Sequence, residues 1–349
     1  AAIGNLSRTI EVVRERERIM TKAVPLTEIW RGPIVESLHL GHAMICDYHG
    51  TLLHAWGDPD AIVYPRSSAK MLQALPLVES GAADGLSDER LALACASHQG
   101  AAIHTEAILA WLADMGLTDD DLRCGPQMPQ DRLAFNNLIK TDGKPCQAHN
   151  MCSGKHAGFI ALAQHLEEPG NYVDVNHPVQ KACLAVFEDL TEVKSPGYGL
   201  DGCTAPNFIT TMHGMARAMG WFSAAREGNS ARARAASRLV NAMYDNPVLV
   251  AGEKRAATEL MRACHETVAL KDGAEGYFIA ILPEQKLGVA LKILDGSMRA
   301  ANCAITTLLV RLGVLDPDHP TAKRFMNAPI RNKNKIEIGQ IKPVDGLLA

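Results

Sequence analysis

The sequence lacks the features that mark membrane proteins and nucleic-acid-binding proteins. No apolar run approaches the roughly 20 residues that a membrane-spanning helix needs. No basic stripe is present, and the formal net charge is −4 over 349 residues, so a nucleic-acid partner is not expected. With 47% hydrophobic residues and neither an internal repeat nor a low-complexity segment, the chain is predicted to be globular and to bind no membrane.

A secretory signal is missing as well. Residues 1–19 include the charged run Arg14–Arg18 and no apolar core ahead of a cleavage site. We interpret them as an N-terminal extension, either native or vector-derived, because Met20 is a suitable start. The nine cysteines are an odd number without a tight framework, so they are predicted to be reduced thiols in a cytoplasmic protein.

Motifs for nucleotides and for penicillin recognition are also absent. Around Gly154-Lys155-His156 the G-x-x-x-x-G-K-[ST] spacing fails, and no G-x-G-x-x-G follows a strand-like run. A nucleotide site is therefore not expected. The S-x-N and K-T-G elements that accompany S-x-x-K in penicillin-recognising hydrolases are missing, and Lys271-Asp272-Gly273 is the nearest sequence to the second.

The patterns that are present predict an α+β fold. Residues 34–56 and 277–293 each read as a hairpin, and a long helix-rich stretch separates them. Neither hairpin is stable alone, so both are expected to join one antiparallel sheet. The helical middle is then an inserted lobe beside the sheet, and a last helix at about 298–312 covers the sheet. Residues 320–349 are predicted to be a tail or an edge strand.

These elements predict a single catalytic unit over residues 20–349. Its sheet lobe takes about 27–65 and 265–349, and its helical lobe takes about 66–264. Small ligands usually bind in clefts between lobes. The seam between the two lobes is therefore the expected place of a functional site.

The stretch Arg66-Ser67-Ser68-Ala69-Lys70 lies at this seam, directly ahead of an apolar helix. Residues three apart share a helix face, so Ser67 and Lys70 are predicted to meet at a helix N-terminus, where backbone N–H groups converge. A lysine with a lowered pKa can deprotonate a serine, which is a route to a nucleophile without histidine. The alternative is that Ser67 only caps the helix and Lys70 is a surface residue.

Two further segments carry candidate catalytic residues. Ser97 and His98 directly follow the apolar run 91–96, so their side chains are expected to lie near the interior. Sequence neighbours do not face each other on a helix, which argues against a direct Ser–His pair. Lys271 precedes the second hairpin and would bring another ammonium to the seam, with a surface-turn lysine as the alternative.

Two cysteines lie in separate glycine-containing segments, Cys152-Ser153-Gly154-Lys155-His156 and Asp201-Gly202-Cys203. Two thiols are half of a soft-metal site. Candidates for the remaining ligands are His156, Asp201 and Lys155, although a lysine amine must first lose a proton. The C-x2-C pattern of a structural zinc site is absent, so two core thiols are the alternative.

Taken together, these segments resemble the rhizobial-type L-asparaginases, also called class 3 or the asparaginase II family. The resemblance runs from about residue 27 to 315, and it is specific because seven motifs occur in the family's order. The motifs are Gly32-Pro33-Ile34-Val35-Glu36, Arg66-Ser67-Ser68-Ala69-Lys70, Cys95-Ala96-Ser97-His98, Leu122-Arg123-Cys124-Gly125, Cys152-Ser153-Gly154-Lys155-His156, Asp201-Gly202-Cys203 and Val250-Ala251-Gly252-Glu253.

The resemblance implies a homodimeric amidohydrolase that converts L-asparagine to L-aspartate and ammonia. It implies a fold similar to serine β-lactamases and glutaminases, in agreement with the two lobes. It also implies two Ser–Lys tandems in the active site. These are Ser67 with Lys70 and Ser97 with Lys271.

The resemblance further implies zinc beside the active site, held by Cys152, Lys155 and Cys203. This favours Lys155 over His156 as a ligand, and we assign His156 to substrate binding. The zinc is expected to orient substrate or loops rather than to activate water, because two thiolates lower its Lewis acidity.

We hypothesise that Ser67, deprotonated by Lys70, attacks the side-chain amide carbon of asparagine. Arg66 and Asp201 would fix the α-carboxylate and α-amino groups by charge complementarity. Two other classes of protein remain as alternatives. One is a penicillin-recognising-type serine hydrolase, and the other is a non-enzymatic zinc-binding protein.

Overall fold

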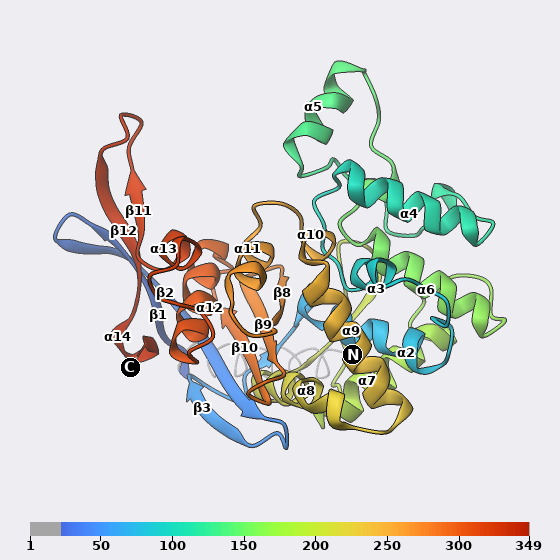
Figure 1. Ribbon diagram of the computed structural model, residues 1–349, viewed down its shortest axis with the longest axis horizontal. Helices are drawn as coiled ribbons and strands as arrows, with labels where there is room; N and C mark the ends of the chain where they lie inside the picture. The colour runs from blue at the N-terminus through green and yellow to red at the C-terminus, as the bar shows by residue number, and fades with distance from the viewer. Residues whose placement is uncertain (1–21, 349) are drawn as a thin grey trace, which may run out of the picture.

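A computed structural model describes residues 22–348 and consists of an antiparallel sheet beside a helical lobe (Figure 1). The strand order is β11-β12-β1-β2-β10-β9-β8, and β3 pairs with β2. The strands are β1 (Val24–Arg31), β2 (Ile34–Asp47), β3 (Leu52–Trp56), β8 (Ala269–Gly273), β9 (Tyr277–Leu282), β10 (Leu287–Ile293), β11 (Ala328–Arg331) and β12 (Glu337–Pro343). The predicted α+β class, with both hairpins in one antiparallel sheet, is confirmed. Residues 1–19, predicted as an extension, lie outside the described part.

The centre of the sheet is covered on both faces. All six residues of β9 are buried, and a strand that is buried throughout must be covered on each side. Helices α8 (Met212–Ala224) and α12 (Met298–Arg311) both pack against β10. A Cβ on Gly288 would lie 2.0 Å from the backbone nitrogen of Gly220. Glycine on β10 therefore lets α8 approach the sheet backbone to backbone.

The helical lobe lies beside β8 and is built around α2, whose residues are buried from Lys70 through Leu77. Helices α6, α7 and α9 pack against α2. The helices of the lobe are α2 (Lys70–Glu79), α3 (Asp88–Ala94), α4 (Ala102–Asp114), α5 (Arg132–Lys140), α6 (Ser153–His165), α7 (Pro178–Thr191), α9 (Ala231–Asp245), α10 (Pro247–Val250) and α11 (Ala256–Ala263).

Shorter elements complete the described part of the chain. Four single turns of 3-10 helix are η1 (Arg66–Ala69), η2 (Asp119–Asp121), η3 (Gln147–His149) and η4 (Ala225–Glu227). Two small sheets pair β4 (Ile62–Val63) with β7 (Thr210–Thr211) and β5 (Tyr198–Leu200) with β6 (Pro206–Phe208). Helices α13 (Pro320–Phe325) and α14 (Asp345–Leu348) flank the last two strands.

Three details differ from the sequence interpretation or complete it. Strand β1 was not predicted, and it joins the sheet by pairing with both β2 and β12. Of the two options for 320–349 the edge strand is right, because β11 forms the sheet edge. Pro76 lies inside α2, which continues to Glu79. Burial of α2 in the lobe offsets the hydrogen bond that proline removes.

Within residues 22–348, no helix combines the length and apolar character that crossing a membrane requires. All nine cysteines fall in this part of the chain, and each is a free thiol. Eight of them are buried, Cys146 being intermediate, and two of the buried cysteines belong to the site described next.

Candidate active site

Ser67 lies in η1, the single turn that leads into α2. The turn is entered through Arg66, whose φ is 52°. This left-handed conformation costs a non-glycine residue about 1–3 kcal/mol and is often found at functional sites. The Ser67 side chain is half-buried, and its hydroxyl has no hydrogen-bond partner among residues 22–348. It caps neither η1 nor α2, so the interpretation of Ser67 as a helix cap is wrong.

Contacts with β8 and β6 hold the η1 turn in place. Ser68 donates from Oγ to the Lys271 carbonyl oxygen over 3.0 Å. A Cβ on Gly273 would lie 2.8 Å from the Pro65 carbonyl oxygen, so glycine permits the close approach of β8. The Arg66 N–H donates to Asn207 Oδ1 over 3.3 Å. The roles of Ser68 and Asn207 in holding this turn could not be predicted, because their partners lie far away along the chain.

Lys70 is buried, with only 1% of its surface exposed. Its Nζ donates to Ser97 Oγ over 3.1 Å, to Cys152 Sγ over 3.3 Å and to the Ala96 carbonyl oxygen. Among the described residues, Lys70 and Ser67 are joined only through the backbone, where the Lys70 N–H donates to the Ser67 carbonyl oxygen, and no hydrogen bond joins their side chains. The structure therefore brings Lys70 directly to Ser97, the serine of the other predicted tandem, and the surface-lysine alternative is wrong.

Ser97 follows α3 and is fixed by its backbone, since its N–H donates to the Val250 carbonyl oxygen over 2.8 Å. The neighbouring His98 contacts Ser153 Oγ through Nε2 at 3.0 Å and stacks on His104, with ring centroids 4.8 Å apart. Burial lowers the pKa of His98 well below its ordinary value. His98 is therefore a neutral residue that connects the end of α3 to the start of α6.

Lys271 lies on β8 and is completely buried, so a lysine in a surface turn is the wrong interpretation. Its Nζ donates to the Asp272 carbonyl oxygen over 2.6 Å and to Asp272 Oδ1 over 3.0 Å. Burial lowers the pKa of Lys271 to about 8, against the opposing effect of Asp272, and the Lys70 cation adds to the lowering. Within residues 22–348 no hydrogen bond joins Lys271 to Ser97, so their predicted tandem is not in direct contact.

The two residues assigned to the charged ends of a substrate are paired with each other. Arg66 Nε lies 2.5 Å from Asp201 Oδ1. Asp201 follows β5 in the turn before β6, and Asn207 donates to its other oxygen over 3.3 Å. This arrangement leaves opposite charges side by side, 28% and 10% exposed respectively.

The predicted metal ligands come from two elements that meet. Cys152 directly precedes α6, Lys155 lies in its first turn, and Cys203 lies in the β5–β6 turn. Lys155 Nζ donates to Cys203 Sγ over 3.2 Å, and a side-chain hydrogen bond joins the two cysteines. That bond holds the pKa of Cys203 well below its ordinary value despite burial, with a further contribution from Lys155, and it raises the pKa of Cys152 to about 12.

The donor set fits a soft metal ion if lysine is included. Among the described residues, no group of three His, Cys, Asp or Glu side chains is arranged to hold a metal. Burial acts against the charge of Lys155, but Cys203 and Cys152 prevail and raise its pKa, so metal binding must displace this proton. His156 contacts Tyr172 through Nδ1 at 3.0 Å, and its buried Nε2 has no partner in the described part of the chain.

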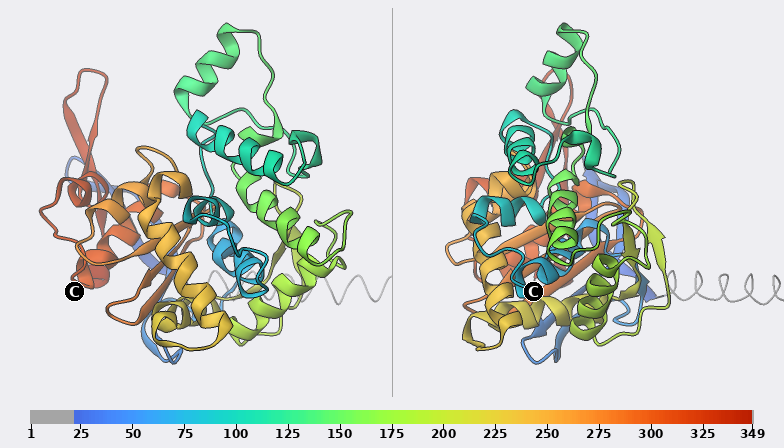
Figure 2. Two further views of the ribbon diagram at one scale, coloured as in Figure 1. Left: turned by 45° about the vertical axis from the view of Figure 1, so that its right-hand side comes forward. Right: turned by 90° about the vertical axis from the view of Figure 1, so that its right-hand side faces the viewer.

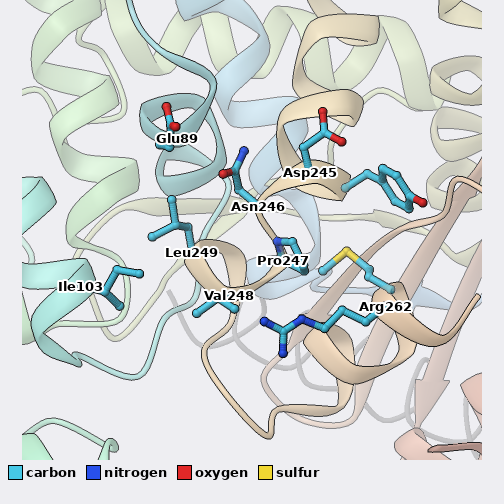
Figure 3. A pocket seen from close by; sticks show the side chains of 10 residues that line it. Glu89, Ile103, Asp245, Asn246, Pro247, Val248, Leu249 and Arg262 are labelled. Atoms are coloured by element: carbon cyan, nitrogen blue, oxygen red, sulfur yellow. The ribbon is translucent and has the colours of Figure 1, made fainter.

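A separate hollow of about 600 Å³ is shown in Figure 3. It contains none of the predicted site residues, and α10 contributes to its wall. Its lining residues are Glu89, Ile103, Tyr244, Asp245, Asn246, Pro247, Val248, Leu249, Met261 and Arg262. Helix α10 lines the hollow, and its last residue, Val250, accepts the hydrogen bond from the Ser97 N–H.

Buried lysines beside serine hydroxyls, at the junction of a sheet and a helical lobe, are typical of serine hydrolases that use lysine in place of histidine. The chain belongs to the L-asparaginase II family, whose model matches residues 27–343. The comparison with curated proteins gives no match.

Several solved structures are similar at low identity. Mglu in its native form has a TM-score of 0.44 and 14% identity, covering 80% of this chain and 66% of the Mglu chain. This chain thus spans slightly less than two thirds of the length of Mglu. A Bacillus glutaminase has a TM-score of 0.42 and 12% identity over 79% of this chain and 91% of its own.

A protein of Bacteroides dorei DSM 17855, described as a candidate beta-lactamase, has a TM-score of 0.37 and 12% identity over 72% of this chain and 84% of its own. Similarities of this size support no inference about activity.

Proposed function

We propose that this chain hydrolyses the side-chain amide of L-asparagine to L-aspartate and ammonia. One observation carries the proposal: the buried Lys70 amine is hydrogen-bonded to Ser97 Oγ and stands three residues from the half-buried Ser67. Membership in the L-asparaginase II family supports asparagine as the substrate.

Ser67 is the proposed nucleophile, because a nucleophile must reach the substrate. Its hydroxyl is half-buried and has no hydrogen-bond partner among residues 22–348, whereas Ser97 is 6% exposed and accepts a bond from Lys70. Oγ of Ser67 adds to the amide carbon, and its proton passes to the Lys70 amine, which can accept it only in the unprotonated form. Backbone N–H groups at the head of α2 stabilise the oxyanion, and such a donor is worth about 100- to 1000-fold in rate.

Collapse of this intermediate breaks the C–N bond, and the nitrogen leaves as ammonia after it receives a proton. We assign this proton to the group formed by Lys70, Ser97 and Lys271. A pKa of about 8 for Lys271 means that its charged and neutral forms are both populated near neutral pH. Water then attacks the aspartyl ester, and Ser67 recovers its proton as L-aspartate is released.

The Arg66–Asp201 pair suits a zwitterionic substrate. An α-carboxylate would take Arg66 as its partner and an α-amino group would take Asp201, so that the substrate exchanges one ion pair for two. His156, buried beside Lys155, completes the proposed substrate-binding set. The unpartnered Nε2 of His156 is the observation that supports this role.

We further propose that Cys152, Lys155 and Cys203 hold zinc when it is bound. The ion would supply a fixed positive charge beside the substrate, and three protein ligands leave a fourth position open. Cys152 also accepts a hydrogen bond from Lys70, so the proposed metal site directly contacts the lysine that takes the proton from Ser67.

Substitution of each serine tests the proposal. Ser67→Ala is expected to lower kcat for asparagine by more than about 1000-fold, because it removes the nucleophile. Ser97→Ala should cost about 100-fold, since it removes only a proton-transfer partner. Ammonia release is measured with asparagine and glutamine in parallel. Mass spectrometry of quenched reactions locates the acyl group.

The control is Ser223→Ala, because Ser223 is a buried serine away from the site, in α8, where its Oγ donates to the Gly220 carbonyl oxygen. It should retain the wild-type rate. An acyl group on Ser97 with an active Ser67→Ala variant would reverse the assignment of the serines. A wild-type protein that releases no ammonia from asparagine would refute the proposed function.

A further inference from the structure

The Asp272 carboxylate lies between two cations. Its Oδ1 is 3.0 Å from Lys271 Nζ, and its Oδ2 is 2.9 Å from Arg255 Nη2. The Lys271 side chain is 0% exposed, that of Asp272 is 10% exposed and that of Arg255 is 35% exposed. The three residues therefore form a chain of contacts that runs from the surface to the buried amine.

We propose that Asp272 and Arg255 are positioning residues for Lys271, Asp272 fixing the amine and Arg255 fixing the carboxylate. The inference rests on the proposed function only in that Lys271 takes part in proton transfer. Neither residue belongs to the tandems or to the metal-ligand set that the sequence motifs indicated.

The hydrogen-bond geometry explains why the amine needs Asp272. A neutral lysine amine has two N–H donors and one lone pair. The carbonyl oxygen and Oδ1 of Asp272 accept from Lys271 over 2.6 and 3.0 Å, so both donors of the neutral form have partners. The lone pair is then the only group left over, and it is free to accept a proton in the reaction.

Arg255 is well placed to hold the carboxylate. It directly precedes α11, and its Nη1 also donates to Gln130 Oε1 over 3.2 Å. The same short segment begins at Val250, whose carbonyl oxygen accepts the Ser97 N–H. Residues 250–255 thus contact Ser97 at one end and Asp272 at the other. This segment links Ser97 and Lys271, the two members of the tandem that are not hydrogen-bonded to each other.

Other titratable groups near Lys271 also affect its pKa. Lys70 on α2 is the second cation, and Cys95 and His98 are the titratable groups that follow α3. Burial raises the pKa of Cys95 to about 12 and lowers that of His98, so both are neutral near pH 7.

The other charged groups on the elements packed against β8 are paired or exposed: Arg66 on η1 pairs with Asp201, and Arg234 and Asp245 on α9 are exposed. On β9 the titratable residue is Tyr277, whose pKa is raised by burial. On α11, Arg262 pairs with Glu253 at the surface, and Glu259 pairs with Arg324. On α9, Arg232 and Arg238 pair with acidic residues, namely Glu79, Asp189 and Asp88.

The proposal predicts shifts of opposite sign in the pH profile. Without the Arg255 cation, the Asp272 carboxylate acts on Lys271 alone, so the ammonium is favoured and the basic form appears at higher pH. Without the Asp272 charge the ammonium loses its counter-ion, so the basic form appears at lower pH. In Arg255→Gln the rising limb of kcat/KM for asparagine should move about one pH unit to the alkaline side, a roughly tenfold loss at pH 7.

Asp272→Asn should move the limb to the acid side and lower its plateau, because the amine is no longer fixed. Arg255→Lys, which retains the charge, should leave the limb near its wild-type position. The matched control is Arg262→Gln, which removes a neighbouring surface arginine and should change nothing. Unchanged limbs in Arg255→Gln and Asp272→Asn, or shifts of the same sign, would overturn the proposal.

A second readout keeps this test separate from the proposed function. The titration of Lys271 is followed by NMR of the labelled lysine side chain in the full-length protein, without substrate. If the wild-type protein fails to hydrolyse asparagine, the proposed function is wrong, yet opposite shifts of this titration still support the positioning pair. If Asp272→Asn does not fold, the comparison of the Lys271 titration in Arg255→Gln and in Arg255→Lys tests the proposal instead.

Discussion

Gly154 and Gly273 determine how closely backbones approach one another around the serines and thiols. A Cβ on Gly154 would lie 2.3 Å from the Leu93 carbonyl oxygen, so α6 begins against the end of α3. This contact brings Cys152 beside Lys70. The backbone of Arg66, with φ of 52°, is a second local constraint, since it directs the turn that carries Ser67. At the residue scale, the site depends on backbone geometry as much as on reactive side chains.

Substitution of Gly154 tests this constraint. Gly154→Ala should lower the free energy of unfolding by about 1–3 kcal/mol, because the new methyl group meets backbone atoms that must shift. Urea denaturation measures the change. Gly346→Ala is the control, since a Cβ there has no atom within 4 Å, and it should be neutral or slightly stabilising. Equal stability of the two variants would contradict the argument.

Helix α5 is the element that contributes least to the fold. It stands apart from both lobes (Figures 1 and 2), and none of its residues is buried. Leu133 is 81% exposed and Ile139 is 63% exposed. The helix is anchored at its base, where the Asp131 N–H donates to the Gln99 carbonyl oxygen over 2.8 Å and Gln130 accepts from Arg255.

Truncation of side chains on α5 should therefore have little effect on stability. Leu133→Ala and Ile139→Ala are each expected to change the free energy of unfolding by less than about 0.5 kcal/mol. Leu260→Ala in α11, a completely buried leucine, should cost about 2–5 kcal/mol. Thermal and urea unfolding provide the comparison. A loss above 1 kcal/mol at Leu133 would show that α5 is covered in solution by something the monomer lacks.

At the scale of the whole molecule, the site is assembled from segments that are far apart in sequence. Ser67 and Lys70 come from the start of the helical lobe, Lys271 comes from the sheet, and Cys203 comes from a turn between small strands. The set Cys152, Lys155 and Cys203 connects α6 to the β5–β6 turn. A metal bound there would therefore crosslink two elements that otherwise meet through hydrogen bonds.

Zinc binding should consequently stabilise the fold. With free zinc at about 100 times its Kd, a single site adds about 2.7 kcal/mol to the free energy of unfolding, so Tm should rise on zinc addition and fall on chelation. Elemental analysis and thermal unfolding test this together. Cys203→Ser should abolish both bound zinc and the Tm rise. Cys264→Ser, a buried thiol outside the set, should retain them, and unchanged zinc content in Cys203→Ser would disprove the ligand set.

Periodicity and motif order in the sequence were sufficient for the class of fold and the family. The apolar runs in 34–56 and 277–293 are short and are broken by turn residues, and such hairpins are stable only as part of a larger sheet, so both could be predicted. Strand β1 was not predicted because its sequence, VPLTEIWR, has no clear strand pattern. The strand is stabilised by pairing with β2 and β12, and the local sequence does not indicate these partners.

Only the tertiary structure decided how the site residues are paired. The spacing of Ser67 and Lys70 indicated a shared helix face, but burial of α2 directs the lysine to Ser97 and Cys152. The same holds for Arg66 with Asp201 and for Lys271 with Asp272 and Arg255. A buried cation takes the acceptors that packing brings within reach, because leaving it unpaired in a low-dielectric interior costs far more than bending a flexible side chain toward them.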